Sequence, residues 1–189
     1  MSLAFARRHT FAPRAARGFT LLEVVITVVL AVILVTIALP SFRELTIRSN
    51  VTTLTNSLVI ALNSARAEAV RRGTLVELVP VSSTSWSGGW YIKADTNFNA
   101  GFATTIGTQS AAPSGYKICP LANGTGAPGT ASSVIFDATG ALRYATSVDV
   151  NIVRPDNKTA LYRWISVSPS GEIKSQTYTS SSTAPTTCS

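Results

Sequence analysis

The chain has 189 residues, 46% of them hydrophobic, and its 16 basic and 9 acidic side chains give a formal charge of +7. This length suits one domain with an appendage. The single histidine, His9, lies near the amino terminus, so the rest of the chain offers none to a Ser-His-Asp or Cys-His catalytic centre or to a His-ligated metal site. The acids are scattered, and no spacing picks out a pair of carboxylates for hydrolysis. We therefore predict no catalytic activity, no cofactor and no metal site.

The first eighteen residues form a basic leader with no acid and four arginines, Arg7, Arg8, Arg14 and Arg17. A basic segment before an apolar one places the start of the chain on the cytoplasmic side of a membrane. Without these four arginines the chain keeps twelve basic and nine acidic side chains. The net charge is therefore largely a property of the leader and is weak evidence for nucleic-acid binding.

An apolar run of 21 residues follows, from Phe19 to Leu39. As a helix it would be roughly 30 Å long, which matches the thickness of a bilayer core. The run is longer than the apolar region of a secretory signal, and no Ala-x-Ala cleavage site follows it. Glu23 lies inside the run, although an ionised carboxylate in hydrocarbon costs about 3 kcal/mol even on lenient scales. A cleaved signal and a plain signal anchor stay open as alternatives, but neither requires this acid.

The string "RGFTLLE" at residues 17–23 resembles the amino-terminal signal of type IV pilins and of the pseudopilins of type II secretion. The resemblance implies that a prepilin peptidase cuts between Gly18 and Phe19 and that Phe19 becomes the N-methylated first residue. It also implies that Glu23 pairs with the amino terminus of a neighbouring subunit and sets the axial register during assembly. A carboxylate in a low-dielectric environment is tolerated beside an opposite charge. Pairing with the chain's own amine and protonation are the alternatives.

Beyond the apolar run, hydrophobic residues recur every three or four positions, as on one face of an amphipathic helix. They are Ile47, Val51, Leu54, Leu58, Leu62, Ala65 and Ala69. Glu68 precedes Arg71 and Arg72 by three and four residues, a spacing that favours ion pairs on a helix. Gly73 is a natural helix stop. We therefore expect one helix over about residues 19–72.

Pro40 falls inside this expected helix. Proline removes a helical hydrogen bond and clashes with the preceding turn, so a kink is expected there. Pilins carry a proline at the matching place, and a membrane exit at Pro40 is the alternative reading. The predicted organisation is a leader (1–18), a transmembrane and assembly half of the helix (19–43), an amphipathic half (44–72) and a periplasmic β-rich head (73–189).

After Gly73 the pattern changes to that of β-strands. The segments that predict strands or hairpins are "TLVELVPV", "GGWYIKAD", "SSVIFDATGALRY", "VDVNIV" and "LYRWISVSPSGEIKSQTYT". Residues 137–140 and 168–171 are turn signals, each expected between two strands. Residues 97–129 predict a long loop interrupted by "GYKICP". The predicted fold class is α+β, a pilin-like lollipop in which a long, kinked N-terminal helix packs on a small antiparallel β-rich head.

Three segments of the body are similar to the GspH/FimT branch of minor pilins and pseudopilins. They are "NSARAEAVRRG" at 63–73, "WSGGWYIKAD" at 86–95 and "ISVSPSGEIK" at 165–174. In an exported domain the only two cysteines, Cys119 and Cys188, are expected to form a disulfide, and two free thiols are the alternative. Closing a loop of about seventy residues would contribute roughly 4 kcal/mol on the chain-entropy model. Pilin disulfides staple the carboxyl-terminal region in a similar way.

The segment "DTNFNAG" at 95–101 looks like half of a calcium loop, with Asp95, Asn97 and Asn99 at alternate positions. An EF-hand loop needs a glycine at its sixth position and a bidentate glutamate at its twelfth, and Ala100 and Ile106 stand there. We therefore favour a polar turn over a calcium site.

Some members of the FimT type bind DNA through a Gly-Arg-x-Arg motif in the last hairpin, where this chain has "GEIK" at 171–174. Glu172 replaces the first arginine and would repel phosphate. A basic patch for DNA would remain if five cations share a face: Arg143, Arg154, Lys158, Arg163 and Lys174. We favour solvated cations on a periplasmic surface.

The resemblance implies a minor pilin or pseudopilin, a structural subunit that assembles into or initiates a type IV pilus or a type II secretion pseudopilus after peptidase cleavage and N-methylation. Expected partners are other major and minor pilins or pseudopilins, the prepilin peptidase and the inner-membrane assembly platform, with nucleic acid less favoured. The expected location is the bacterial inner membrane, single-pass with a periplasmic head, and then the pilus or pseudopilus. The alternatives are a DNA-binding minor pilin for natural transformation and a major structural pilin.

Overall fold

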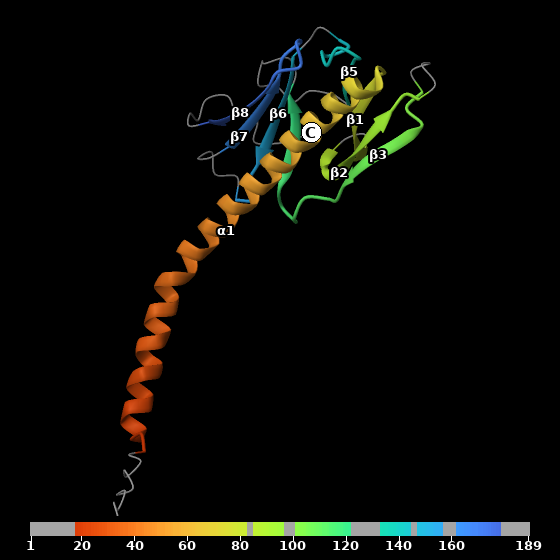
Figure 1. Ribbon diagram of the computed structural model, residues 1–189. Coiled ribbons are helices and arrows are strands. Elements are labelled where there is room, and N and C mark those ends of the chain that lie inside the picture. The colour runs from red at the N-terminus through yellow and green to blue at the C-terminus, as the bar shows by residue number, and fades with distance from the viewer. Residues whose placement is uncertain are drawn as a thin grey trace, which may run out of the picture. The chain divides into compact units, whose positions relative to one another are not determined.

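The computed structural model describes residues 18–82, 85–96, 101–121, 133–144, 147–156 and 162–178, which include one helix and eight strands (Figure 1). The chain divides into two compact units between Phe42 and Arg43. Among the described residues, the first unit contains residues 18–20 and the apolar part of the helix, and the second contains the remainder of the helix and every strand. The division into leader, helix halves and head stays a prediction.

The helix α1 spans Leu21–Arg72 without interruption, as the sequence predicts. It begins directly after Thr20, whose hydroxyl oxygen accepts a hydrogen bond from the backbone N–H of Glu23 at 3.2 Å, an N-cap contact. It ends at Gly73, whose φ of 66° lies in the left-handed region. The N–H groups of Gly73 and Thr74 both donate to the carbonyl oxygen of Ala69, at 2.9 and 3.3 Å. The predicted helix stop is confirmed.

The strands form two four-stranded sheets in which every neighbouring pair is antiparallel. The first sheet has the order β3-β2-β1-β5, with β1 (Val76–Ser82), β2 (Ser85–Ala94), β3 (Thr104–Gln109) and β5 (Val134–Phe136). The second has the order β4-β6-β7-β8, with β4 (Lys117–Leu121), β6 (Val148–Val153), β7 (Tyr162–Val167) and β8 (Ile173–Tyr178). Figure 1 shows the carboxyl-terminal half of α1 lying against both sheets.

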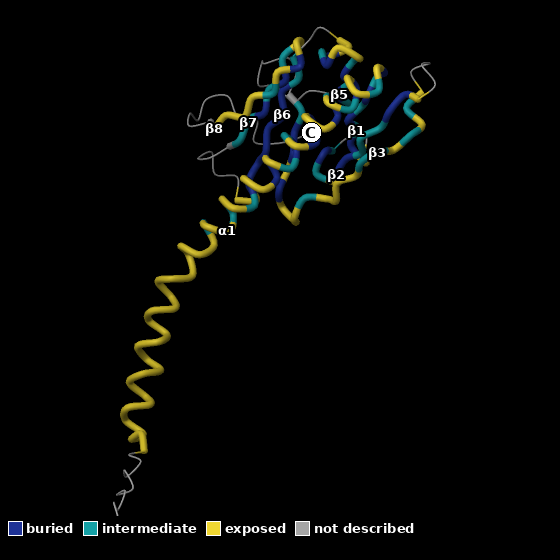
Figure 2. Tube along the Cα trace, viewed as in Figure 1, coloured by how far each residue is buried: buried dark blue, intermediate teal, exposed yellow. Residues whose placement is uncertain are grey.

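The core of the second unit lies between α1 and the two sheets (Figure 2). The predicted apolar stripe is confirmed, because Val51, Leu54, Leu58, Leu62, Ala65 and Ala69 are all buried and Ile47 is partly buried against them. The largest side chains from the sheets include Trp86 and Trp90, whose ring centroids lie 6.4 Å apart. The helix is therefore held to the sheets chiefly by apolar burial.

Most strand predictions are confirmed, but the loop predicted over residues 97–129 is wrong in part, because β3 lies within it. Its sequence "TTIGTQ" lacks the apolar alternation that marks a half-buried strand. β3 is an edge strand formed by backbone pairing with β2, for example Tyr91 with Thr108. The turn at 137–140 is confirmed, yet within the described residues 133–144 it is followed by a single bridge, between Phe136 and Leu142, where a strand was predicted.

Two hairpin turns meet at one end of the head. The turn at 137–140 closes with a hydrogen bond from Gly140 N–H to Asp137 O at 2.9 Å, and the turn at 168–171 closes from Gly171 N–H to Ser168 O at 2.8 Å. Arg66 on α1 bridges them, because its Nε donates to Gly140 O at 2.9 Å and its Nη2 to Ser170 O at 3.4 Å. One helix residue thus joins a turn of the first sheet to a turn of the second.

Candidate assembly site

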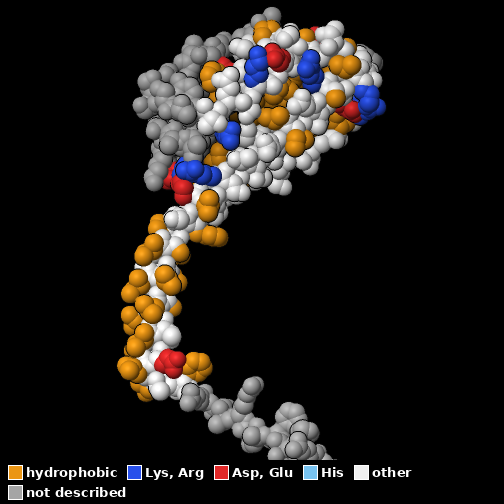
Figure 3. Space-filling view, turned by 60° about the vertical axis from the view of Figure 1, so that its left-hand side comes forward, with side chains coloured by type: hydrophobic (Ala, Val, Ile, Leu, Met, Phe, Trp, Pro, Cys, Tyr) orange, Lys and Arg blue, Asp and Glu red, His pale blue; other side chains and the backbone are white. Residues whose placement is uncertain are grey.

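The first part of α1 presents a continuous apolar surface with no described residue covering it. Every large apolar side chain from Phe19 to Phe42 is exposed. Figure 2 colours this part of α1 as exposed, and Figure 3 shows hydrophobic side chains along the face that it draws. The helix is long and apolar enough to cross a membrane. Such a surface is stable in water only when lipid or other protein covers it, so this part of the chain is built to contact one or both.

The threonines within this surface satisfy their own hydroxyl groups. Thr27 Oγ1 donates to the carbonyl oxygen of Val24 at 2.8 Å, and Thr36 Oγ1 donates to that of Ile33 at 2.7 Å. This back-bonding is how Ser and Thr are accommodated in helices that meet hydrocarbon. Thr20 is used by the N-cap. Glu23 is therefore the one polar side chain of the run that the helix itself does not account for through a side-chain hydrogen bond.

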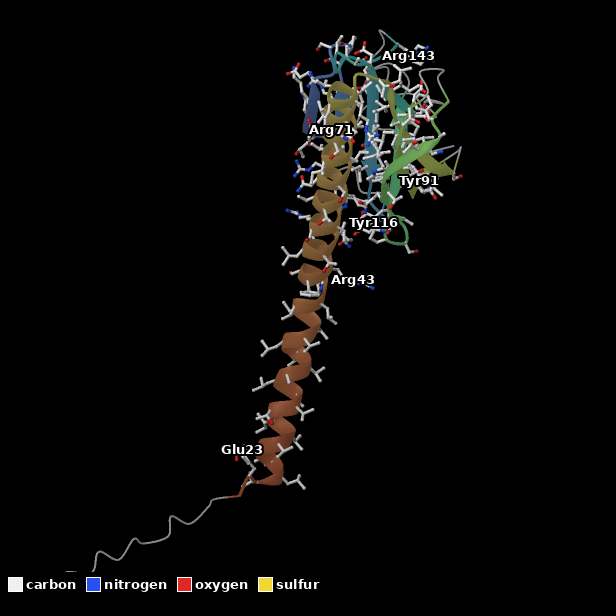
Figure 4. All side chains as sticks on the ribbon, turned by 45° about the vertical axis from the view of Figure 1, so that its right-hand side comes forward. Glu23, Arg43, Arg71, Tyr91, Tyr116 and Arg143 are labelled. Atoms are coloured by element: carbon white, nitrogen blue, oxygen red, sulfur yellow. The ribbon has the colours of Figure 1, made fainter. Side chains whose placement is uncertain are left out.

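Glu23 lies in the first turn of α1, as Figure 4 shows. Thr20 caps the helix, and Glu23 stands three residues later, which is the spacing of a capping box. A carboxylate in the first turn also interacts favourably with the helix dipole. The Thr-x-x-Glu spacing in the sequence signals this local arrangement, which our predictions did not include. Glu23 thus has a reason to follow Thr20 that is independent of any neighbouring subunit.

Gly18 and Phe19 lie just before the helix, and Phe19 is 81% exposed. A Cβ added to Gly18 would meet nothing within 4 Å, so no described residue crowds this peptide. Cleavage after Gly18 and methylation of Phe19 stay predictions. The kink at Pro40 stays a prediction as well, since α1 is assigned as one helix through that residue.

A buried guanidinium joins α1 to the turn after β6. The side chain of Arg154 is only 1% exposed. Its Nη1 and Nη2 donate to the two carboxylate oxygens of Glu44 at 3.0 and 2.6 Å, and its Nε and Nη2 donate to Asp156 at 3.0 and 2.8 Å. Arg48 adds a bond from Nε to Glu44 at 2.8 Å. The donors from Arg154, and then those from Arg48, lower the pKa of Glu44 from its usual value to about 2.

A second network, confined to the surface of α1, matches the predicted ion pairs. The Nε atoms of Arg71 and Arg72 each donate to the carboxylate of Glu68 at 2.7 Å. These hydrogen bonds lower the pKa of Glu68 to about 2. The sequence predicts this network because its members are three and four residues apart. It does not predict the Glu44–Arg154 pair, whose members are 110 residues apart.

Comparison with protein families decides the identity of the chain. The protein-family model described as "Type II transport protein GspH" matches residues 54–171, which is more than half of the chain. The chain belongs to the GspH family. The model of the prokaryotic N-terminal methylation motif matches residues 13–39, the part that contains the predicted cleavage site and Glu23. No curated protein matches the chain.

One solved protein, in two crystal forms, shows the same fold as this GspH-family chain. The type IV minor pilin FimU of Pseudomonas aeruginosa matches in two crystal forms, at TM-scores of 0.55 and 0.51 and identities of 18% and 19%. These matches cover 71% and 68% of this chain and 90% of FimU. The minor pseudopilin EpsH from the Type 2 Secretion System of Vibrio cholerae matches at a TM-score of 0.47 and 12% identity, over 68% of this chain and 97% of EpsH. The predicted α+β class, a long helix packed on antiparallel sheets, is confirmed.

Family membership confirms the main functional prediction. The chain is a minor pilin or pseudopilin of the GspH type with a prepilin N-methylation motif, and it is a structural protein, not an enzyme. Its place is the inner membrane and then the pilus or pseudopilus. Membership also implies processing by prepilin peptidase and partners within a pseudopilus.

Four of the five cations suggested for DNA binding are described, and three of these four do not share an exposed face. Arg154 is buried between two carboxylates. Arg163 is paired with Thr177, and Lys174 with Ser166, so Arg163 and Lys174 lie on opposite faces of the second sheet. Lys174 also forms an ion pair with Glu172 at 3.1 Å. Arg143 is exposed, and Lys158 lies outside the described residues. On the face that Figure 3 draws, blue and red side chains are interspersed.

Two further predictions fall partly outside the described residues. Asp95 is buried at the end of β2, and its N–H donates to the carbonyl oxygen of Leu75 at 2.9 Å. Asn97 and Asn99 are not described, so the calcium loop is untested. Cys119 is fully buried in β4, while Cys188 lies outside the described residues. The disulfide stays a prediction.

Proposed function

We propose that this GspH-family subunit acts by helix-mediated assembly, with Glu23 reading the axial register, and that it helps to start a filament as a minor subunit at the tip. Cleavage between Gly18 and Phe19 would free an amino terminus, which becomes N-methylated on Phe19. The carboxylate of Glu23 would then pair with the amino terminus of a neighbouring pilin or pseudopilin. The partners are other major and minor subunits, the prepilin peptidase and the inner-membrane assembly platform.

The observation that supports the proposal most directly is the uncovered apolar surface from Phe19 to Phe42, with a single acid in it. Apolar contacts with lipid and with other helices have nearly the same strength, so they cannot by themselves fix how far one helix slides along another. A buried ion pair can, because a misplaced charge is left without a partner. Glu23 is the charge on this surface that such a rule would use.

Glu23→Gln and Glu23→Ala test the register role separately from the capping role. Gln keeps the length of the side chain and suits the capping box but loses the charge, whereas Ala loses both. We expect both variants to be processed normally and to enter sheared filaments at least about tenfold less, since unpairing a buried charge costs several kcal/mol. The mass of the membrane-extracted chain reports processing, and quantitative immunoblots of filaments report incorporation.

Glu68→Gln is the matched control, because Glu68 is also on α1 but lies in the described head and pairs only within the helix. It should incorporate like the unmodified chain. Normal incorporation of Glu23→Gln together with reduced incorporation of Glu23→Ala would show that Glu23 serves the cap alone. An intact leader in the unmodified chain would contradict the whole scheme.

A further inference from the structure

We propose that Arg154 is a positioning residue that clamps residues 44–50 of α1 to the second sheet, so that any loosening of the helix at Pro40 ends at Glu44. The clamp itself is independent of the proposed function, and only its consequence for assembly rests on that function.

The apolar core holds the helix only from Val51 onward. Val51 is 3% exposed and is the first buried residue of α1. In the preceding stretch, Leu45, Thr46, Arg48 and Ser49 are exposed, and Ile47 is only partly buried. Apolar burial therefore leaves residues 44–50 weakly attached, and a helix segment with few buried contacts opens locally at low cost.

Polar contacts hold this segment instead. Arg154 makes a two-pronged pair with Glu44, and a second polar contact lies at the other end of the segment, where Asn50 Nδ2 donates to the hydroxyl oxygen of Tyr116 at 3.1 Å. Both partners flank strands of the second sheet: Tyr116 comes just before β4, and Arg154 comes just after β6. The segment is thus fixed at both ends by side chains from outside the helix.

The turn that carries Arg154 is itself held in place. Gly115 has a φ of 86°, and a Cβ built on it would lie 2.9 Å from the Cβ of Pro155. The chain next to Tyr116 therefore packs closely on the residue next to Arg154. Asp156 binds the guanidinium from the same turn at 2.8 Å. Arg154 is oriented before it meets Glu44, which reduces the entropy lost in forming the pair.

The ion pair between Arg154 and Glu44 is stronger than an ordinary surface salt bridge because Arg154 is buried. Exposed ion pairs contribute little because water and salt screen them. Arg154 is 1% exposed, so removing the carboxylate of Glu44 would take a charge partner away from a buried guanidinium. Arg also offers the planar fork that binds both oxygens of a carboxylate, which Lys lacks.

The clamp lies close to Pro40 in the sequence, so it limits how far a loosening of α1 at Pro40 can extend. Pro40 lies inside α1 and has no N–H, so the carbonyl of Thr36 lacks its helical donor. Glu44 stands four residues after Pro40 and is bound by Arg154, which follows β6 of the second sheet. A helix that loosens around Pro40 therefore meets a fixed point at Glu44, and residues 44–72 stay part of the head.

Hydrogen exchange by mass spectrometry on the full chain in detergent tests the clamp. In Arg154→Met and in Glu44→Gln, we expect the amides of residues 45–50 to exchange at least about tenfold faster, while the amides of β1 and β2 keep their rates. Arg154→Lys should give an intermediate increase, because it keeps the charge without the fork. Glu68→Gln is the matched control and should accelerate exchange only near residues 68–72.

Unchanged exchange at 45–50 in both Arg154→Met and Glu44→Gln would overturn the clamp. Equal acceleration throughout the head in both variants would also overturn it, because it would show a general loss of stability instead of a local release. Glu44→Gln keeps the result decisive if Arg154→Met does not fold. In the filament assay, reduced incorporation of processed Glu44→Gln supports the link to assembly, and normal incorporation would overturn that link while leaving the clamp.

Discussion

Gly171 lies where the two hairpin turns of the head touch. Its φ is 79°, and a Cβ built on it would be 1.9 Å from the carbonyl oxygen of Gly140 and 3.0 Å from Arg66 Nε. The same glycine occupies the first position of the segment that resembles a DNA-binding motif in the FimT type. In this chain the packing of one turn on another is sufficient to require it.

Gly171→Ala should therefore destabilise the head. Both the left-handed backbone and the contact with Gly140 oppose a side chain, so we expect a loss of about 1–3 kcal/mol in the free energy of unfolding. Gly88→Ala is the control, because a Cβ at Gly88 would meet only the carbonyl oxygen of Ser85 at 3.9 Å. Urea unfolding of the two variants measures the difference. Equal stability of the two would contradict the packing role.

Charged residues show what local spacing can predict. The pairs of Glu68 with Arg71 and Arg72 follow from the geometry of one helix. Thr20 and Glu23 carry a capping signal that is equally local. Arg154 offers no such signal, and as a residue in a sequence it is one more cation. Only the fold brings Glu44 to it and removes it from the surface where nucleic acid could reach it.

At the scale of elements, α1 was predictable because its apolar positions repeat with the period of a helix. The buried and exposed positions of its second half follow that period along the chain. Strands with apolar alternation were predictable for a similar reason. β3 was not, because an edge strand with one side open needs few apolar residues and is formed by pairing with β2.

Leu58→Ala and Ile60→Ala test the facing of the helix. Leu58 is fully buried in the core, whereas Ile60 is 64% exposed two residues away. We expect Leu58→Ala to lower the free energy of unfolding by about 2–5 kcal/mol through lost burial and a cavity. Ile60→Ala should change it by about 0.5 kcal/mol or less. Thermal unfolding of both variants compares them, and a larger loss for Ile60→Ala would reverse the assigned faces.

At the scale of the whole molecule, a GspH-type subunit combines an uncovered apolar helix with a head that has its own core. The apolar part needs lipid or other subunits, whereas the head buries its own apolar surface between α1 and two sheets. Assembly is the function such a chain can perform without catalytic groups. The two sheets are joined through α1, through Arg66 and by a bond from Ile118 N–H to Ser87 Oγ at 2.9 Å.

The predicted disulfide belongs to this scale, because it would close a loop of about seventy residues. In a nonreducing digest of the exported protein we expect one peptide pair that links Cys119 to Cys188. Cys188→Ser should lower the free energy of unfolding by about 2–4 kcal/mol. Reductant should cause the same loss in the unmodified chain and none in the variant. Thiols that react with a labelling reagent in the unreduced, denatured chain would exclude the bond.

Local patterns in the sequence determined the family signal at residues 17–23, the length and facing of α1, its stop at Gly73 and most of the strands, because each depends on residues a few positions apart. The tertiary structure alone decided the pairing of β3, the clamp between Glu44 and Arg154, the contact of Gly171 with Gly140 and the separation of Arg163 from Lys174. These depend on which distant segments the folded backbone places side by side. The periodicity of apolar residues along the chain does not tell which distant segments will come together.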